Sequence, residues 1–265
     1  MSEASGPILE ARGLRAQYGS TPALRGLDAS VERGEIAALL GENGSGKSTL
    51  LKVITRILPV AGGALLLEGR PLAAMPRRET ARRIAYLPQS LDLVFPIRSL
   101  DLVLQGRAPH DRGFSADSAD DRQRAVEAMR ACDVESLAER DASALSGGEQ
   151  RRVFLARALA QEAEIWLLDE PASGLDPRHR LEFLEILTRT HRQRATTVIL
   201  VTHEVDLAAE LADRVVVLRE GRTLVQGPPQ EVLTAENLRR AFSVETRVEV
   251  DSSGRRRFVP VAPSR

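Results

Sequence analysis

A glycine-rich segment from Gly41 to Thr49 carries the residues with the most specific chemistry in this chain of 265 residues. It reads GENGSGKST and matches the phosphate-loop pattern G-x-x-x-x-G-K-[ST]. Its glycines let consecutive backbone N–H groups turn toward an anion, and the helix that follows adds the positive end of its dipole. Lys47 then reaches the β- and γ-phosphates of a nucleoside triphosphate, and the Ser48 hydroxyl binds Mg²⁺. The candidate nucleotide-binding residues of this loop are Gly41, Asn43, Gly44, Ser45, Gly46, Lys47, Ser48 and Thr49.

Two neighbouring acids, Asp169 and Glu170, form a second candidate group at the end of an apolar run that starts at Ile165. A buried strand with this sequence places its terminal carboxylates at the carboxyl edge of a sheet, beside bound phosphates. Asp169 is suited to hold Mg²⁺ through water, and Glu170 to polarise an attacking water as general base. Solvated acids that end a strand are the structural alternative. The upstream phosphate loop favours the catalytic interpretation.

The remaining motifs point to a family. The segment LSGGEQ, Leu145 to Gln150, is similar to the signature motif of ATP-binding-cassette (ABC) ATPases. The other motifs of that family follow in the expected order. Tyr18 resembles the adenine-stacking aromatic residue, Gln89 the Q-loop glutamine, Ser173 to Asp176 the D-loop, and His203 the switch histidine.

The resemblance covers roughly residues 8 to 233 and implies a role for each matching position. Gln89 would offer its carbonyl to Mg²⁺ or to the attacking water, and His203 a hydrogen bond to the γ-phosphate. Each has a structural alternative: a half-buried tyrosine at position 18, a loop amide for Gln89 and a core-capping histidine for His203. The signature loop, Ser146, Gly147 and Gly148, precedes a helix of about residues 149–160, so a plain helix N-cap is its alternative. Asp176 joins the nucleotide-binding set through the D-loop match.

An α/β fold is predicted by short β-rich runs that alternate with helical patterns. Apolar runs without alternation predict buried strands in one largely parallel sheet at residues 84–87, 165–168, 196–201 and 215–218. The family resemblance implies a P-loop NTPase-type nucleotide-binding domain over residues 1–243. Its parts would be a mostly parallel core sheet, an antiparallel β subdomain and a helical subdomain inserted at about residues 90–160. A loop is predicted at 108–118, a helix at 230–242, and a short hairpin in the tail at 244–265.

Composition limits the function classes. Lys plus Arg equals Asp plus Glu at 37 each, so no global field attracts nucleic acid, and none is expected as partner. Cys132 is the single cysteine, which excludes an intrachain disulfide and suits a reducing compartment. No apolar run approaches the roughly 18 residues that span a bilayer. The chain is therefore expected to be cytoplasmic and to reach the inner face of the cell membrane through a partner.

The partners follow from the resemblance. It implies a head-to-tail homodimer with two ATP at its interface, integral membrane permease subunits that dock between the helical subdomain and the Gln89 loop, and a substrate-binding protein of the same system. Without the dimer a single chain would be nearly inactive.

The cargo is suggested by the segment from Val103 to His110, VLQGRAPH. It resembles the V-x-x-G-R-x-P-H segment of cassettes that serve iron-siderophore, haem and cobalamin importers, although Gln105 stands where that group carries an apolar residue. Simple termination of a helix also accounts for a Gly-Arg-x-Pro segment. The alternatives are a cassette for zinc or manganese, amino acids or lipids, or a soluble ABC ATPase acting on ribosomes or DNA. The last is disfavoured because the chain has no long coiled coil, zinc insertion or second cassette.

Overall fold

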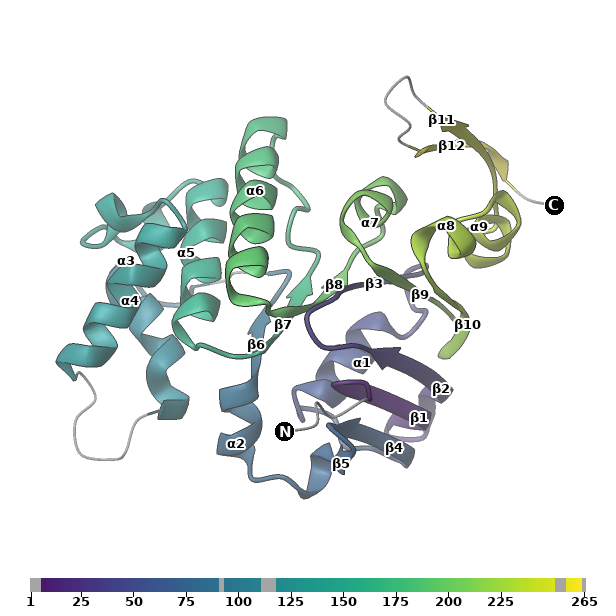
Figure 1. Cartoon of the computed structure of the whole chain (residues 1–265), viewed down its shortest axis with the longest axis horizontal. Helices are drawn as coiled ribbons and strands as arrows, with labels where there is room; N and C mark the ends of the chain where they lie inside the picture. The colour runs from purple at the N-terminus through teal and green to yellow at the C-terminus, as the bar shows by residue number, and fades with distance from the viewer. Residues whose placement is uncertain (1–5, 91–92, 111–117, 251–255, 264–265) are drawn as a thin grey trace. The chain divides into compact units, whose positions relative to one another are not determined.

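The computed structural model describes residues 6–90, 93–110, 118–250 and 256–263. These residues form two compact units (Figure 1). The first unit combines residues up to Met75 with those from Thr197 onward, and the second unit spans Pro76–Thr196. Most of the loop predicted at 108–118 lies outside the described residues. Among the described residues, no helix has the length and apolarity required to cross a bilayer.

Two kinds of strand pairing build the first unit. An antiparallel sheet has the order β2-β1-β4-β5, and the central strand β3 pairs in parallel with β8 and with β9, which in turn pairs antiparallel with β10. All five residues of β3 are buried, which explains the lack of alternation in its sequence. The elements of this part of the unit are β1 Leu9–Tyr18, β2 Thr21–Val31, β3 Ile36–Leu40, α1 Lys47–Ile54, β4 Gly62–Leu67, β5 Arg70–Pro71, η1 Leu72–Ala74, β8 Thr197–Val201, α7 Val205–Leu211, β9 Arg214–Arg219 and β10 Arg222–Gly227.

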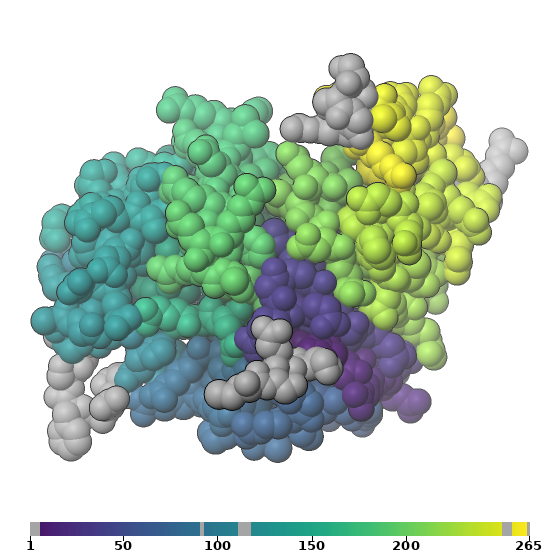
Figure 2. Space-filling model, in the orientation of Figure 1, coloured from purple at the N-terminus to yellow at the C-terminus, as the bar shows by residue number. Residues whose placement is uncertain are grey.

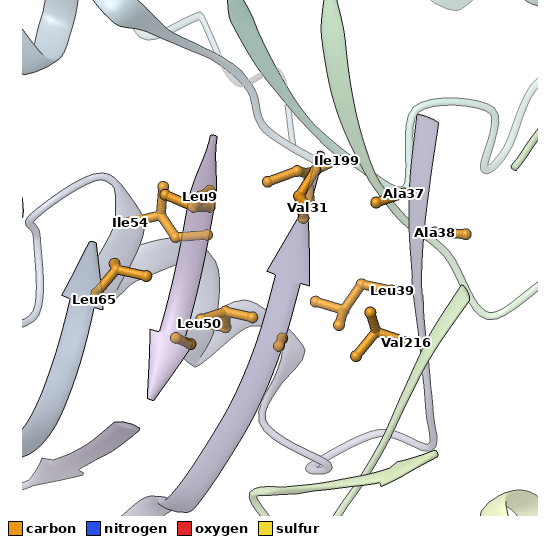
Figure 3. Close-up of a pocket in the computed structure, with 12 residues that line it drawn as sticks. Leu9, Val31, Ala37, Ala38, Leu39, Leu50, Ile54, Leu65, Ile199 and Val216 are labelled. Atoms are coloured by element: carbon orange, nitrogen blue, oxygen red, sulfur yellow. The ribbon is translucent and has the colours of Figure 1, made fainter. Parts of the chain in front are cut away.

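Helix α1 is held in the core of this unit by its apolar side. Leu50 and Ile54 of α1 line a cavity of about 30 Å³ together with apolar residues of β1, β2, β3, β4, β8 and β9 (Figure 3). The lining is entirely apolar, so the cavity is a packing gap rather than a ligand site. Because α1 is fixed in this way, its first residue, Lys47, has a defined place at the end of β3.

The second unit combines a parallel strand pair with a group of helices. β6 pairs in parallel with β7, as the apolar runs predict, and α3, α4 and α5 pack against one another (Figure 1). The α/β fold class, with parallel strands, an antiparallel sheet and helices, is confirmed. The elements of this unit are α2 Arg77–Arg83, β6 Ile84–Leu87, α3 Ser99–Leu104, η2 Gln105–His110, α4 Ala119–Ala131, η3 Glu135–Leu137, η4 Ala142–Ala144, α5 Gly147–Ala160, β7 Ile165–Asp169 and α6 Pro177–Arg194.

The prediction of a single helix at residues 230–242 is wrong. The structure has α8, Pro229–Val232, and α9, Ala235–Phe242, separated by Leu233 and Thr234. The Thr234 side chain accepts a hydrogen bond from the Asn237 backbone N–H at 3.2 Å, so it caps a new helix instead of continuing the old one.

The chain ends in two antiparallel strands, β11 Val244–Val250 and β12 Arg256–Pro263, that belong to the first unit. Figure 2 shows them in yellow beside the yellow-green residues of α8 and α9. Phe258 is only 8% exposed and packs in an apolar cluster with Leu238 and Ala241 of α9. Its backbone N–H donates to Asp206 Oδ1 of α7 at 3.0 Å, so the tail is fastened to the helix that follows His203.

Candidate functional site

The phosphate loop connects β3 to α1, and its conformation depends on glycine. Gly44 and Gly46 have φ angles of +84° and +111°, a region that other residues rarely adopt. A Cβ on Gly46 would also lie 2.9 Å from Leu24 Cδ2. Gly46 is the N-cap of α1, it provides no side-chain cap, and the first turn has no acidic residue. The positive end of the helix therefore faces the loop without a competing anion from its own first turn.

Lys47 and Ser45 place polar groups inside this loop. The Lys47 side chain is buried, and its Nζ donates to the carbonyl oxygens of Gly41 at 2.6 Å and Glu42 at 2.9 Å. Among the described residues, the buried Oγ of Ser45 has no hydrogen-bond partner. Ser48, in the first turn of α1, is exposed. A buried ammonium, an unsatisfied hydroxyl and a glycine cradle fit the triphosphate that the sequence predicts.

His203 lies at the same end of the sheet as the phosphate loop. In the parallel pair, Leu39 of β3 is opposite Val201 of β8, and the Thr202 N–H donates to the Leu39 carbonyl at 3.2 Å. Gly41 comes two residues after Leu39, and His203 comes two residues after Val201. The His203 side chain is exposed. The Thr202 Oγ1 accepts the Glu204 N–H at 3.1 Å and shapes the turn into α7. The fold thus brings two separate motifs to one edge.

Tyr18 is tied to the same helix as Lys47. It is the last residue of β1, its side chain is 44% exposed, and Lys52 Nζ lies 5.3 Å from the centre of its ring. Such a cation–π contact is worth about 0.5–1 kcal/mol at an exposed site. Lys52 is one of only two lysines in the chain, and sequence reasoning gave it no role. Its position five residues after Lys47 was the available signal.

The second unit holds the candidate base, Glu170, and two of the candidate metal ligands, Gln89 and Asp169. Leu87 of β6 is opposite Leu168 of β7, so Gln89, Asp169 and Glu170 come at the same edge of this strand pair. Asp169 and Glu170 are buried, whereas Gln89 is exposed. Glu170 has a φ of +48°, a conformation that non-glycine residues adopt mainly where the surroundings impose it. The surroundings of Glu170 therefore hold its backbone in a conformation that few non-glycine residues adopt.

Tyr86 is a site residue that sequence reasoning missed. Its hydroxyl donates to Asp169 Oδ2 at 3.3 Å. Burial, followed by the charge of Asp169, raises the pKa of Tyr86 to about 12. The hydroxyl therefore keeps its proton at neutral pH and remains a donor that orients the carboxylate of Asp169. The signal in the sequence was its place three residues before Gln89, in a strand that pairs with β7.

Arg151 joins two of the predicted loops. This buried residue of α5 donates from Nη1 to the Gln89 carbonyl at 3.3 Å and from Nη2 to the Ser173 carbonyl at 3.2 Å. Burial lowers its pKa, which still leaves an arginine charged at neutral pH. The loop after β6 and the loop after Glu170 thus share one cation, a contact that no local sequence pattern indicates.

The signature loop begins α5 with a complete capping box. The Ser146 Oγ accepts the Glu149 N–H at 3.3 Å, and Glu149 Oε2 accepts the Ser146 N–H at 2.9 Å and its hydroxyl at 2.7 Å. The hydrogen bonds to Ser146 lower the pKa of Glu149. The helix starts at Gly147, two residues earlier than predicted. The N-cap alternative therefore describes what Ser146 does within this chain, and leaves its nucleotide role as a prediction.

Asp176 caps the neighbouring helix α6. Its Oδ1 accepts the N–H groups of Arg178 at 3.0 Å and His179 at 3.1 Å, and its Oδ2 bonds the His179 Nδ1. The bond to the His179 side chain is the main reason that the pKa of Asp176 is lowered. His179, unassigned from the sequence, in turn packs on Gly148: a Cβ there would lie 2.6 Å from the imidazole Cγ and Cδ2.

Substitution of Gly148 by alanine is expected to destabilise the protein by about 1–3 kcal/mol, because the new methyl group overlaps the His179 ring near its own Cβ. Urea unfolding followed by circular dichroism measures the loss. The double variant Gly148→Ala/His179→Ala should recover most of the stability. Equal losses with and without His179 would show that this ring is not what excludes a side chain at position 148.

The predicted residues divide between the two units. In the first unit, the structure brings together the phosphate loop and His203, and it ties Tyr18 to α1 through Lys52. In the second unit, it gathers Gln89, Asp169 and Glu170 at one strand edge, and Arg151 connects that edge to the helix that Ser146 begins. The residues of the second unit supply oxygen atoms that can bind a metal, together with a buried carboxylate. Those of the first unit supply cations and backbone N–H groups. Phosphoryl transfer requires groups of both kinds.

Comparison with known proteins identifies the family. The family model for the ABC transporter matches residues 24–173. The hemin import ATP-binding protein HmuV of Streptomyces coelicolor is 46% identical over 86% of this chain and 81% of its own length. The ferric enterobactin transport ATP-binding protein FepC of Escherichia coli is 35% identical over 89% of this chain and 87% of its own. An inward-facing structure of an ABC transporter of metal-chelate type superposes with a TM-score of 0.84 at 28% identity, covering 97% of this chain and 98% of that one. This chain belongs to the ABC transporter ATPase family.

Proposed function

We propose that this chain is the ATP-hydrolysing subunit of an ABC importer that takes up a metal chelate, such as an iron-siderophore, haem or cobalamin, through separate permease subunits. The observation that carries the proposal is the high identity to hemin and siderophore import subunits along most of both chains. The segment Gly106 to His110, called the GRAPH segment after its sequence, lies in η2 and supports the same cargo class. Because a cassette contacts nucleotide and permease but not cargo, a cassette for zinc or manganese, amino acids or lipids is the alternative.

Hydrolysis is assigned to residues of both units. The phosphate loop and Lys47 bind the β- and γ-phosphates, and Tyr18 offers its ring to the adenine base. Glu170 accepts a proton from the attacking water, and His203 donates a hydrogen bond to the γ-phosphate. Ser48, Gln89 and Asp169 would hold Mg²⁺, for which a hydroxyl, an amide carbonyl and a carboxylate are suitable oxygen ligands. When bound, the ion neutralises charge that develops on the transferring phosphoryl group.

ATP binding is proposed to control a head-to-tail dimer. The related cassette MJ0796, 25% identical with a TM-score of 0.73, has been observed as a dimer bound to ADP and Pi. In this chain, Ser146, Gly147, Gly148 and Asp176 would meet the γ-phosphate held by the partner protomer. The triphosphate then stabilises the closed dimer more than the open one, and hydrolysis removes that difference. The energy of ATP thus reaches the permease as a change in dimer population.

A test of the function uses tagged Glu170→Gln protein, expressed in the native host, which is expected to bind ATP without turnover. Gently solubilised membranes should yield an integral membrane permease by mass spectrometry, together with a substrate-binding protein if the system is an importer. Tagged Lys47→Ala protein is the matched control and should retain less permease. Recovery with ribosomes or DNA-processing proteins would contradict a transport function, and a permease of another cargo class would overturn only the metal-chelate assignment.

A further inference from the structure

The GRAPH segment, in which Gly106 to His110 form most of η2, has an unusually buried arginine. Arg107 is 6% exposed, and three acceptors surround its guanidinium. Its Nε donates to Asp121 Oδ1 of α4 at 2.8 Å, and its Nη1 donates to the Ala160 carbonyl at 2.7 Å and to Glu162 Oε2 at 2.8 Å. Ala160 is the last residue of α5, so the arginine binds the negative end of the helix dipole as well as two carboxylates.

Two further residues of the segment fasten to the same end of α5. A Cβ on Gly106 would overlap the Arg157 carbonyl, so only glycine lets η2 lie directly on the last turn of the helix. His110 Nε2 bonds the Gln161 carbonyl at 2.9 Å. The side chain of Gln161 in turn donates to the Ile84 carbonyl at the start of β6 at 2.8 Å. The GRAPH segment is therefore more than the end of a helix. Gly106, Arg107 and His110 together form a joint, meaning a set of contacts that attaches η2 to the C-terminal end of α5.

Helix α5 connects this joint, at its C-terminal end, to the signature loop at its N-terminal end. Its 14 residues run from Gly147 to Ala160, a length of about 20 Å, and most of its sides are buried. A buried helix behaves as a stiff rod, so the hold on its last turn helps to set the direction of its first turn. The first turn is where Ser146 and Glu149 form the capping box.

The other side of the joint leads to an exposed apolar pair. Helix α3 runs without a break into η2. Val94 and Phe95, shortly before α3, are 81% and 77% exposed, and they form an adjacent pair of apolar side chains at the surface. From this pair the chain continues through α3 to Arg107, and both α3 and η2 contact α5.

We propose that Arg107 is a positioning residue that couples α3 to the signature helix α5, so that the GRAPH segment sets where Ser146 stands when the ATP-bound dimer closes. The inference rests on the proposed function, because it needs the signature loop to act at the dimer interface. The GRAPH segment, which resembles a segment of metal-chelate cassettes, then has a mechanical role. It connects the surface before α3 to the nucleotide-dependent interface. Arg107 is not among the residues proposed to bind nucleotide.

The test measures ATP affinity and ATP-driven dimerisation separately. In a Glu170→Gln background, Arg107→Met is expected to leave ATP affinity within about twofold of the parent, since the phosphate loop belongs to the other unit. Its dimerisation, followed by analytical ultracentrifugation with saturating MgATP, should weaken by about 10-fold, inside the range of 5- to 150-fold typical of coupling between sites. Arg107→Lys keeps the charge but cannot reach all three acceptors. Its dimerisation should be weaker than that of the parent and stronger than that of Arg107→Met.

Arg189→Met is the matched control, because Arg189 also donates to the carbonyl at the end of a helix, Ala131 of α4, at 2.7 Å without holding α5. Its dimerisation should equal that of the parent. Equal weakening in both variants, or unchanged dimerisation with Arg107→Met, would overturn the positioning role. If Arg107→Met does not fold, the comparison is made with Arg107→Lys. Dimerisation of that variant equal to the parent's would likewise overturn the positioning role. A parent that binds ATP and stays monomeric would contradict the proposed function itself.

Discussion

Replacement of Lys47 by alanine is expected to lower ATP affinity by more than about 100-fold. The Lys47 ammonium is buried at the start of α1, where its bonds to the Gly41 and Glu42 carbonyls hold it over the loop. Each charge-assisted hydrogen bond contributes about 1.5–3 kcal/mol, and 1.4 kcal/mol corresponds to a tenfold change in Kd. Calorimetric titration with MgATP measures the change directly.

Lys52→Ala is the matched control for this experiment, because Lys52 is the other lysine of the chain and lies on the same helix. It contacts the Tyr18 ring and no phosphate-loop carbonyl that the structure describes. A loss of only about two- to fivefold is expected, which corresponds to a cation–π contact at an exposed site. Similar losses in the two variants would refute the specific phosphate role of Lys47, since a general effect of positive charge on α1 would then explain both.

Glu170→Gln is expected to lower the turnover of ATP by about 10²–10⁴-fold while ATP binding persists. The amide keeps the shape of the buried side chain but cannot accept the proton of the attacking water, and general-base catalysis accounts for a factor of this size. ATP should then accumulate in a closed dimer. Single-turnover hydrolysis of radiolabelled ATP, combined with size-exclusion chromatography, measures both effects.

The control for this prediction is Glu185→Gln on α6, an exposed carboxylate that belongs to none of the family motifs. Its turnover should match the unmodified protein. Normal hydrolysis by the Glu170 variant would remove Glu170 from the mechanism. Loss of ATP binding together with turnover would instead show that the carboxylate supports the fold of the site, for which its positive φ provides a reason.

The local chemistry of this protein was accessible from its sequence. The phosphate loop was predictable because its function depends on glycine conformations and on a cation within nine consecutive residues. Buried strands such as β6 and β7 were predictable because strands covered on both faces have uninterrupted apolar runs. The family motifs predicted Gln89, Glu170 and His203 as site residues, and each of the three follows a strand at its carboxyl end.

Contacts between distant segments were decided only by the tertiary structure. Arg107 meets Asp121 and Glu162, 14 and 55 residues away, and Tyr86 meets Asp169 across 83 residues. Sequence reasoning weighed the GRAPH segment only as a family marker or as helix termination. Neither interpretation predicts that Arg107 bonds to residues so far along the chain, because the residues that it meets depend on how the helices pack.

The break between α8 and α9 shows the same limit at short range. Residues 230–242 have a helical pattern, and the pattern does not reveal that Thr234 turns its hydroxyl to the Asn237 N–H and begins a new helix. Periodicity reports which residues face a core, whereas the direction in which the chain enters that core is set by packing. The sequence by itself determined the chemistry and the order of its motifs, and the tertiary structure decided which side chains hold those motifs in place, since burial and distance exist only after the chain has folded.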